Sequence, residues 1–455
     1  MRLFLLLFAL VLSENSGFAA PYFQVRLSRP LAVYLFVNEL SGNGRPGNPF
    51  QKLYTASRFE TPETKAALAD FDTLNLYYSY EFPQYPALSK IPGQTDALLR
   101  RALLLSTDLS DFKNRATGIL PKEDFARLLR TLAAFEVAYD SLVFFPLKQD
   151  FTQQLSACAQ RLHAPTVSDF FRKMARFHGQ QDTGNDTFQV AFYPLPKSRG
   201  FRATAFADCS VSALPEGERD YEMLLSVTLH EIAHILYDDQ PLFLKETIQR
   251  AFQESKFPGA ANAYLLLNEA QATALGNGAA FLALTGTLDS GSWYNNKYRN
   301  DMAKAMYPLV ADYLNQSKTI DSAFVAEYCR LYATRFPEWE GEAAHLFTNR
   351  FVVANDYAAI QHVQKAFPVT SNTHGATPFN ADNLEKLKAS ALTKVLILDP
   401  AISGNVALAR RFFPEIQTDT KTLQKGFARY KMPDGTWLYV LFAGKKPLAE
   451  MLHKL

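Results

Sequence analysis

The chain has 455 residues, a formal net charge of +2 and 20% charged residues. This length exceeds what one hydrophobic core usually supports, so we expect two or three domains or subdomains. The near-neutral charge gives no electrostatic argument for nucleic-acid binding, and no run of basic residues indicates a membrane surface as partner. With 48% hydrophobic residues, the composition is that of a folded protein and excludes wholesale disorder.

Residues 1–19 have the layout of a secretory signal peptide. A short positive start precedes the unbroken apolar run Leu3–Leu12, and the small residues Gly17 and Ala19 suit cleavage after Ala19. The apolar run is too short to span a bilayer, and no later segment is long enough either. The alternative is a buried N-terminal helix. We therefore expect an exported protein, periplasmic or secreted, with no membrane insertion once the signal is removed.

Three cysteines, Cys158, Cys209 and Cys329, lie far apart in the sequence. Their spacing matches neither a zinc knuckle nor a redox motif. One disulfide with one buried thiol and three buried thiols both remain open, and we favour three small apolar core residues.

Residues 20–180 are expected to be mostly helical. Residues 22–40 begin with alternation typical of a strand and pass into a helical pattern, and a loop rich in Gly, Asn and Pro follows at 41–49. From about 95 to 178, apolar residues recur every three and four positions, which is the period of amphipathic helices.

Residues 181–365 are expected to form the main functional domain. Two strands are predicted at 186–196 and 201–214, with Lys197–Gly200 as the turn between them. Long helices are then predicted near 219–238, 241–255, 259–285, 297–317 and 321–335.

Residues 366–383 are rich in Thr, Asn, Pro and Gly, which predicts a linker. Residues 384–455 then read as a small α/β region, with a buried strand at 393–400 and a hairpin whose turn is Asp434-Gly435. The whole chain is therefore predicted to be α+β and predominantly helical.

The motif that carries chemistry is His-Glu-Ile-Ala-His at 230–234. On a helix, His230 and His234 project from one face about one turn apart, a spacing that lets two imidazoles bind one tetrahedral zinc. Glu231 is offset around the helix, where it can take a proton from zinc-bound water. The flanking residues are uncharged, as a buried metal helix requires. The alternative is two histidines on an apolar face that meet core partners.

A catalytic zinc usually has three protein ligands and an open position for water. A third His six residues after His234 is excluded, since Gln240 occupies that position. Glu269, 35 residues beyond His234, is a lone acid in an apolar helical stretch. A buried carboxylate needs a strong partner, and a zinc ion is one. The alternative, a carboxylate on a helix surface, fits poorly with the apolar run Leu265–Leu267 before it.

The HEIAH motif followed by Asn-Glu-Ala-Gln-Ala after this spacer resembles the gluzincin metallopeptidases, the thermolysin-like branch of the zincins. The resemblance covers about residues 190–320; beyond them there is a loose likeness to exported bacterial proteins. It implies that His230, His234 and Glu269 bind one Zn²⁺ per chain and that Glu231 is the general base and proton shuttle. It also implies a zincin-like domain in which an edge strand within 186–214 holds an extended peptide.

Two features depart from the thermolysin family itself. The position four residues past the third ligand, which holds a carboxylate in those enzymes, is Thr273 here, and their upstream Asn-Ala signature is missing. We therefore expect the first ligand's support to come from elsewhere, with Asp238 or a backbone carbonyl as candidates.

An oxyanion-stabilising side chain is expected after the ligand helix. Tyr294 and Tyr298 are candidates, and we favour Tyr298 because it would open the following helix. The alternative is a packing or surface tyrosine. The remaining candidates are His345, His362, His374 and Arg299.

The predicted function is hydrolysis of peptide bonds in a peptide or protein outside the cytoplasm, by Glu-assisted attack of zinc-bound water. Two alternatives remain: another zinc-dependent amide or ester hydrolase, and a non-catalytic binding protein that retains the metal helix.

Overall fold

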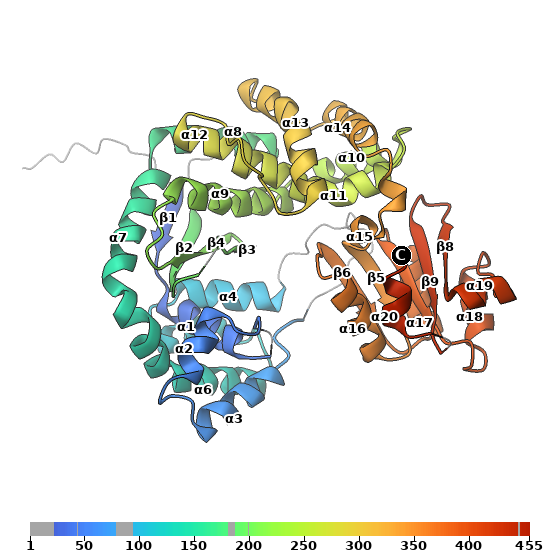
Figure 1. Cartoon of the computed structure of the whole chain (residues 1–455). Coiled ribbons are helices and arrows are strands. Elements are labelled where there is room, and N and C mark those ends of the chain that lie inside the picture. The colour runs from blue at the N-terminus through green and yellow to red at the C-terminus, as the bar shows by residue number, and fades with distance from the viewer. Residues whose placement is uncertain (1–21, 43, 79–93, 181–186, 199, 445) are drawn as a thin grey trace, which may run out of the picture. The chain divides into compact units, whose positions relative to one another are not determined.

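The structure is a computed structural model (Figure 1). It describes residues 22–42, 44–78, 94–180, 187–198, 200–444 and 446–455. The predicted signal peptide lies outside these residues. The chain is α+β and predominantly helical, as predicted. It divides into a first unit (residues 1–74, 99–172 and 181–221) and a second unit (75–98, 173–180 and 222–455).

The first unit combines helices with a four-stranded sheet. Its elements, two of which cross a unit boundary, are β1 (Phe23–Arg26), α1 (Arg29–Leu40), α2 (Pro49–Thr55), α3 (Pro62–Asp72), α4 (Thr95–Leu105), α5 (Leu109–Ala116), α6 (Lys122–Tyr139), η1 (Asp140–Phe144), α7 (Phe145–Leu162), α8 (Pro165–Phe177), β2 (Phe188–Leu195), β3 (Ala203–Phe206) and β4 (Cys209–Pro215). The strand order is β1-β2-β4-β3; β2 pairs in parallel with β1 and β4, and β3 is antiparallel to β4. The strand-then-helix pattern at 22–40 and the helical region from about 95 are thereby confirmed.

The prediction of a single strand at 201–214 is wrong. The stretch folds into β3 and β4, because the chain reverses at Ala207, whose φ is +47°, and Asp208. Arg101 binds both oxygens of Asp208, at 2.6 and 2.9 Å, which holds this turn in place. The strand that follows β2 in the chain is β3, which pairs with β4 and not with β2. The two strands on either side of Lys197–Gly200 therefore do not form a hairpin.

The strands before the metal helix group with the first unit. Phe23 of β1 pairs in register with Phe188 of β2, so these strands belong to the sheet that the N-terminal segment opens. Residues 181–221 accordingly cluster with the N-terminal helices, whereas the sequence pattern assigned them to a domain over 181–365.

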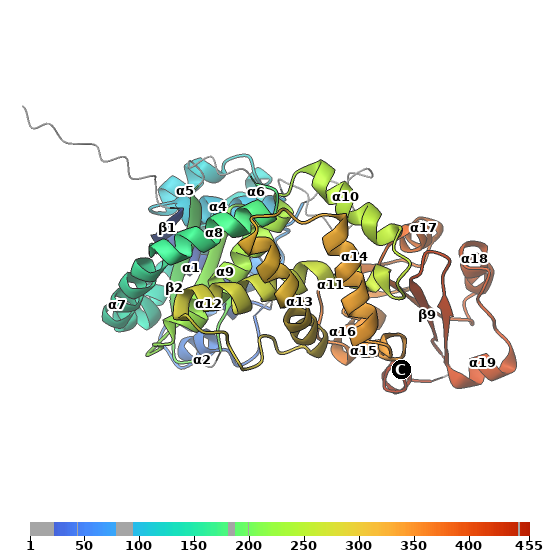
Figure 2. The same ribbon diagram turned by 90° about the horizontal axis from the view of Figure 1, so that it is seen from above.

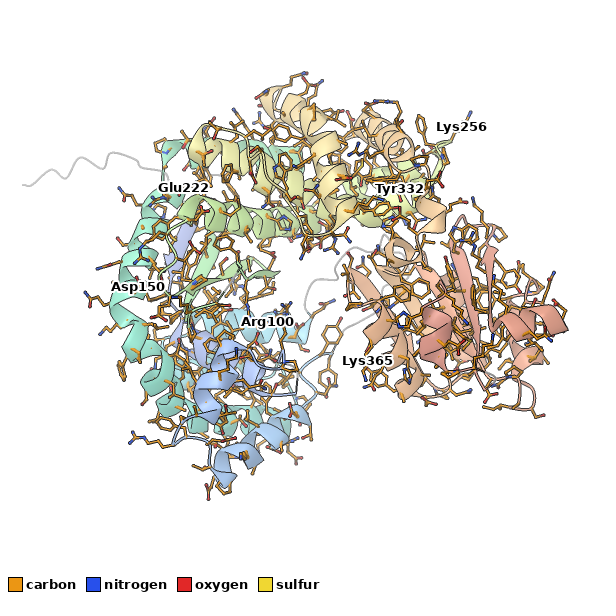
Figure 3. All side chains as sticks on the ribbon, in the orientation of Figure 1. Arg100, Asp150, Glu222, Lys256, Tyr332 and Lys365 are labelled. Carbon is orange, nitrogen blue, oxygen red and sulfur yellow. The ribbon has the colours of Figure 1, made fainter. Side chains whose placement is uncertain are left out.

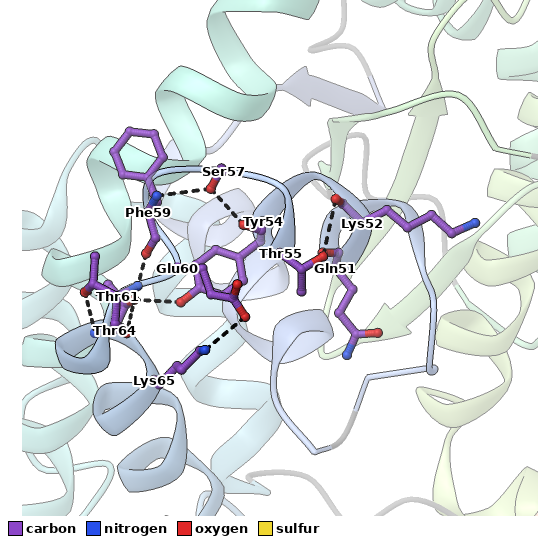
Figure 4. Close-up of polar contacts among 10 residues, drawn as sticks. All are labelled: Gln51, Lys52, Tyr54, Thr55, Ser57, Phe59, Glu60, Thr61, Thr64 and Lys65. Carbon is purple, nitrogen blue, oxygen red and sulfur yellow. Dashed lines mark hydrogen bonds and ion pairs between the residues drawn. The ribbon is translucent and has the colours of Figure 1, made fainter.

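Polar contacts fix the start of α3 against α2 (Figure 4). Thr61 and Thr64 form a capping box, in which each hydroxyl accepts from the other residue's backbone N–H. The Tyr54 hydroxyl lies 2.6 Å from the Thr64 hydroxyl, and Lys65 pairs with Glu60 at 3.2 Å. These local bonds satisfy the N–H groups that a helix start leaves open.

The second unit begins with a group of helices. They are α9 (Tyr221–Asp238), α10 (Leu242–Gln253), α11 (Ala260–Thr273), the π-helical segment η2 (Ala274–Ala280), α12 (Phe281–Thr285), α13 (Lys297–Asn315), α14 (Ser322–Arg335), η3 (Trp339–Gly341) and α15 (Ala343–Leu346). Helices α11, α13 and α14 pack against one another in both views (Figures 1 and 2). The predicted helices are confirmed, except that the one predicted at 259–285 contains a π-helical segment.

A five-stranded sheet completes the second unit. Its elements are β5 (Asn349–Val353), α16 (Tyr357–Ala366), β6 (Asn372–Ala376), α17 (Ala381–Ala389), β7 (Thr393–Leu398), α18 (Asn405–Phe412), α19 (Thr420–Lys425), β8 (Phe427–Lys431), β9 (Trp437–Phe442) and α20 (Leu448–Leu452). The order is β6-β5-β7-β9-β8, parallel apart from the β8–β9 pair. The predicted hairpin is present, and Gly435 adopts the positive φ of +80° that its turn requires.

The segment 366–383 is built into this sheet rather than linking two regions. Within it, β6 pairs in parallel with β5 along Asn349–Val353, and the Ser371 N–H donates to the Thr348 carbonyl at 2.8 Å. Its small polar residues indicated a connection, but backbone pairing with β5 makes it a strand at one edge of the sheet.

Two smaller expectations can be compared with the structure. Cys158, Cys209 and Cys329 are all buried thiols that form no disulfide in the described part of the chain, as favoured. Among the described helices, none combines the length and the apolar character needed to cross a membrane.

Candidate metal centre

Helix α9 carries the two histidines of the motif. Its apolar side chains, including Leu229, Ile232 and Ala233, are fully buried, so the helix is set into the second unit by that face. His230 is 6% exposed, and His234 is half-buried. Figure 3 places Glu222 on the first turn of this helix. Burial of uncharged flanks around two imidazoles is the arrangement that the sequence pattern predicted.

The two imidazoles face each other. The Nε2 atoms of His230 and His234 lie 3.1 Å apart, and the ring centroids are 4.7 Å apart. Glu269 of α11 joins them: one ligand atom from each of the three residues lies within 4.8 Å of the others. The structure thus brings together the three expected ligands, and this group could hold a metal ion.

Asn268 supports the second histidine. Its side-chain oxygen lies 2.8 Å from Nδ1 of His234, so Nδ1 carries the hydrogen and Nε2 keeps its lone pair toward His230. The sequence pattern predicted support for the first histidine, His230, from Asp238 or a backbone carbonyl, and it did not predict that Asn268 contacts the second histidine. The available signal was its position directly before Glu269 on the same helix.

The first histidine lies directly against η2. A Cβ added at Gly276 would come within 2.5 Å of His230 Cβ and 2.7 Å of its Cα, so only glycine permits this approach. Burial lowers the pKa of His230 to about 3, and a side-chain contact from Asn277 opposes this shift. Within the described residues, Nδ1 of His230 is buried without a hydrogen bond of normal geometry. The imidazole is therefore neutral, which is the form that binds metals.

Glu269 is ionised although it is largely buried. Burial alone would raise its pKa, but His234, Arg299 and a hydrogen bond from Tyr294 hold the pKa of this carboxyl below its usual value. Its Oε2 atom lies 3.6 Å from Nη1 of Arg299 and has no hydrogen-bond partner among the described residues. A buried, charged oxygen without such a partner is what a metal ligand requires.

The tyrosine beside the cluster is Tyr294. Its ring centroid lies 6.2 Å from that of His230, and its hydroxyl accepts a hydrogen bond of 2.5 Å from Nη1 of Arg299. Tyr298, the favoured candidate, instead stacks on His345 with centroids 3.4 Å apart and packs against Phe336. Because Tyr298 starts α13 with its ring in an aromatic group, it is Tyr294 in the preceding loop that meets the cluster.

Of the remaining candidates, Arg299 lies beside Glu269, whereas the three histidines lie outside the cluster. His345 is buried and hydrogen-bonded at 2.9 Å to the hydroxyl of Tyr332, which Figure 3 labels on α14. His362 on α16 and His374 on β6 are exposed. Glu231 follows His230 on α9 and is half-buried.

Comparison with protein-family models, with curated proteins and with solved structures finds no match to this chain. The functional argument therefore rests on the residues and their geometry.

Proposed function

We propose that this protein is a zinc-dependent metallopeptidase of the gluzincin type, with His230, His234 and Glu269 as its ligands. The observation that carries the proposal is the convergence of three ligand atoms, from two helices, within 4.8 Å of one another. Two imidazoles and a carboxylate are among the donors that zinc prefers in catalytic sites. A ligand set on two helices, α9 and α11, in a predominantly helical α+β chain also agrees with the zincin-like domain suggested by the motifs.

The spacing of the donors suits a tetrahedral ion. Two zinc–nitrogen bonds of about 2.1 Å place their nitrogens roughly 3.4 Å apart, close to the observed 3.1 Å between the Nε2 atoms. Asn268 leaves the Nε2 lone pair of His234 directed at Nε2 of His230, so a metal ion could bind both nitrogens there.

When bound there, zinc would acidify a water molecule and polarise the scissile carbonyl. Glu231 accepts the proton of the attacking water and delivers it to the leaving amine. The Tyr294 hydroxyl donates a hydrogen bond to the oxyanion, and the bond from Arg299 to its oxygen sets the orientation of the phenol. Asn268 keeps His234 in the tautomer that binds metal. The substrate is a peptide or protein outside the cytoplasm.

The test combines metal content with activity in the purified full chain. We expect about one zinc per chain by elemental mass spectrometry, lost or much weakened in His230→Ala and Glu269→Ala. We expect Glu231→Gln to keep its zinc and to lose hydrolysis of fluorescein-labelled casein and of a mixed peptide library.

Other outcomes separate the alternatives. A wild type that takes up no zinc after reconstitution makes the motif a core feature and overturns the proposal. Zinc with hydrolysis of esters or small amides but not of peptides indicates a different hydrolase. A Glu231→Gln variant with zinc and full biological activity indicates a non-catalytic binding protein.

A further inference from the structure

Arg299 connects the metal cluster to the C-terminal sheet. Its side chain is 7% exposed. On one side, Nη1 donates to the Tyr294 hydroxyl at 2.5 Å and lies 3.6 Å from Glu269 Oε2. On the other side, Nη2 donates to the Ser371 hydroxyl and to the Thr370 carbonyl, the latter at 3.3 Å. The guanidinium is thus held between the two parts of the second unit.

The distance between Arg299 and Glu269 is longer than a hydrogen bond. A buried guanidinium beside a buried carboxylate normally closes to a charge-assisted hydrogen bond of about 2.8 Å. Here Arg299 stops at 3.6 Å, and Glu269 Oε2 has no hydrogen-bond partner in the described part of the chain. Nη2 donates to Ser371 and Thr370 and Nη1 donates to Tyr294, and no hydrogen bond of Arg299 reaches this carboxylate oxygen.

The hydrogen bonds of Arg299 also argue against a role for this residue in binding substrate. The two Nη groups of Arg299 already donate to the protein on both sides, and the guanidinium also stacks on Tyr294, 4.9 Å from its ring centroid. A substrate carboxylate gripped in bidentate fashion needs a pair of N–H groups that point the same way. Both bidentate edges of the guanidinium include Nη2, which already donates to Ser371 and Thr370, so the role of Arg299 is to position its neighbours.

The two residues that accept hydrogen bonds from Nη2 of Arg299 belong to the C-terminal region, in which the sequence shows no catalytic motif. Thr370 and Ser371 directly precede β6, and the Ser371 N–H is bonded to the Thr348 carbonyl at 2.8 Å. The backbone of the sheet therefore fixes the position of this segment, and the segment in turn fixes the guanidinium.

We propose that Thr370 and Ser371 restrain Arg299 at 3.6 Å from Glu269, so that the guanidinium cannot close to a direct hydrogen bond, which keeps this carboxylate available to the metal. This inference rests on the proposed zinc site. Under this proposal the C-terminal α/β region contributes to metal binding, and Arg299 and Ser371 are positioning residues.

The test is a double-mutant cycle on zinc affinity in the full chain, measured by competition with a chelator. In Ser371→Ala the guanidinium of Arg299 can move toward Glu269 and compete with zinc for the carboxylate. We therefore expect the zinc dissociation constant to rise about tenfold, which corresponds to roughly one hydrogen bond to a charged group. In an Arg299→Met background, Ser371→Ala has no such effect. Ser371→Thr, which keeps the hydroxyl, retains wild-type affinity.

The matched control is Thr373→Ala, which removes an exposed hydroxyl two residues after Ser371, on β6, and which we expect to bind zinc as the wild type does. In addition, a structure of metal-free Ser371→Ala is expected to show Arg299 within hydrogen-bond distance of Glu269. Equal zinc affinity for Ser371→Ala and wild type overturns the restraint, as does the same weakening in the Arg299→Met background. A wild type that binds no zinc overturns both this inference and the proposed function, whereas the first two outcomes leave the zinc site intact.

Discussion

Nδ1 of His234 lies 2.8 Å from the side-chain oxygen of Asn268, the residue directly before Glu269. One turn of α11 therefore supplies the carboxylate of the cluster and also orients the imidazole of His234. This pairing couples α9 to α11 at the point where a metal would bind, and it suggests the first of four experiments.

Replacing Asn268 tests the orientation of His234. We expect Asn268→Ala to weaken zinc binding about 10- to 100-fold, because the imidazole loses the acceptor that selects its tautomer. Asn268→Asp keeps an acceptor and should bind zinc at least as tightly as the wild type. Chelator competition measures both, and wild-type affinity in Asn268→Ala would show that this contact does not support the site.

Replacing Gly276 tests the close approach of η2 to α9. In Gly276→Ala the new Cβ meets backbone and Cβ atoms of His230 at 2.5 to 2.8 Å, so the two helices must separate. We expect a loss of about 1–3 kcal/mol in the free energy of unfolding, together with weaker zinc binding. Gly341→Ala is the control, since its Cβ would meet nothing within 4 Å. A Gly276→Ala protein as stable as the wild type would mean that the contact relaxes at no cost.

Two tyrosine variants decide which hydroxyl serves the reaction. We expect Tyr294→Phe to lower kcat for casein hydrolysis about 10²- to 10³-fold while zinc stays bound, since an oxyanion donor acts in the transition state. Tyr298→Phe, whose ring stacks on His345, should change kcat little. If Tyr298→Phe lowered kcat and Tyr294→Phe did not, Tyr298 would be the oxyanion donor, as the sequence analysis favoured.

The stability of the second unit should depend on pH through His345. Burial, with a smaller contribution from Lys297, lowers the pKa of His345 to about 3. Between that value and the unfolded pKa of about 6.5, the unfolded chain binds the extra proton, so stability falls as the pH falls. Lowering the pH from 8 to 5.5 should cost the wild type about 1.4 kcal/mol more than it costs His345→Gln.

Urea unfolding followed by tryptophan fluorescence measures this difference. The three tryptophans, Trp293, Trp339 and Trp437, all lie in the second unit, so the signal reports on the part of the chain that contains His345. Identical pH dependence in wild type and variant would show that His345 does not titrate on unfolding.

Local patterns were sufficient to predict the helices and the three residues that the structure brings together, His230, His234 and Glu269. The positions of His230 and His234 follow from the 3.6-residue period, because residues four apart share a helix face whatever the rest of the chain does. Glu269 could be identified because a lone acid among apolar residues of a long helix needs a partner. Each inference used only neighbours along one helix.

Strand pairing could not be predicted in the same way. Nothing along 201–214 shows that β4 lies between β2 and β3, or that a strand within 366–383 pairs with β5. Alternation within a segment indicates that it is a strand but carries no information about its partner, which is chosen by packing across the sheet.

The sequence by itself therefore determined the helix of His230 and His234, the choice of Glu269 as a candidate partner and the predominantly helical class, because these depend on periodicity and local composition. Only the tertiary structure decided that Asn268 orients His234, that Tyr294 rather than Tyr298 meets the cluster, and that Ser371 holds Arg299 away from Glu269. Those contacts join segments far apart in the chain, and their geometry follows from how helices and sheet pack together rather than from the order of residues within any one of them.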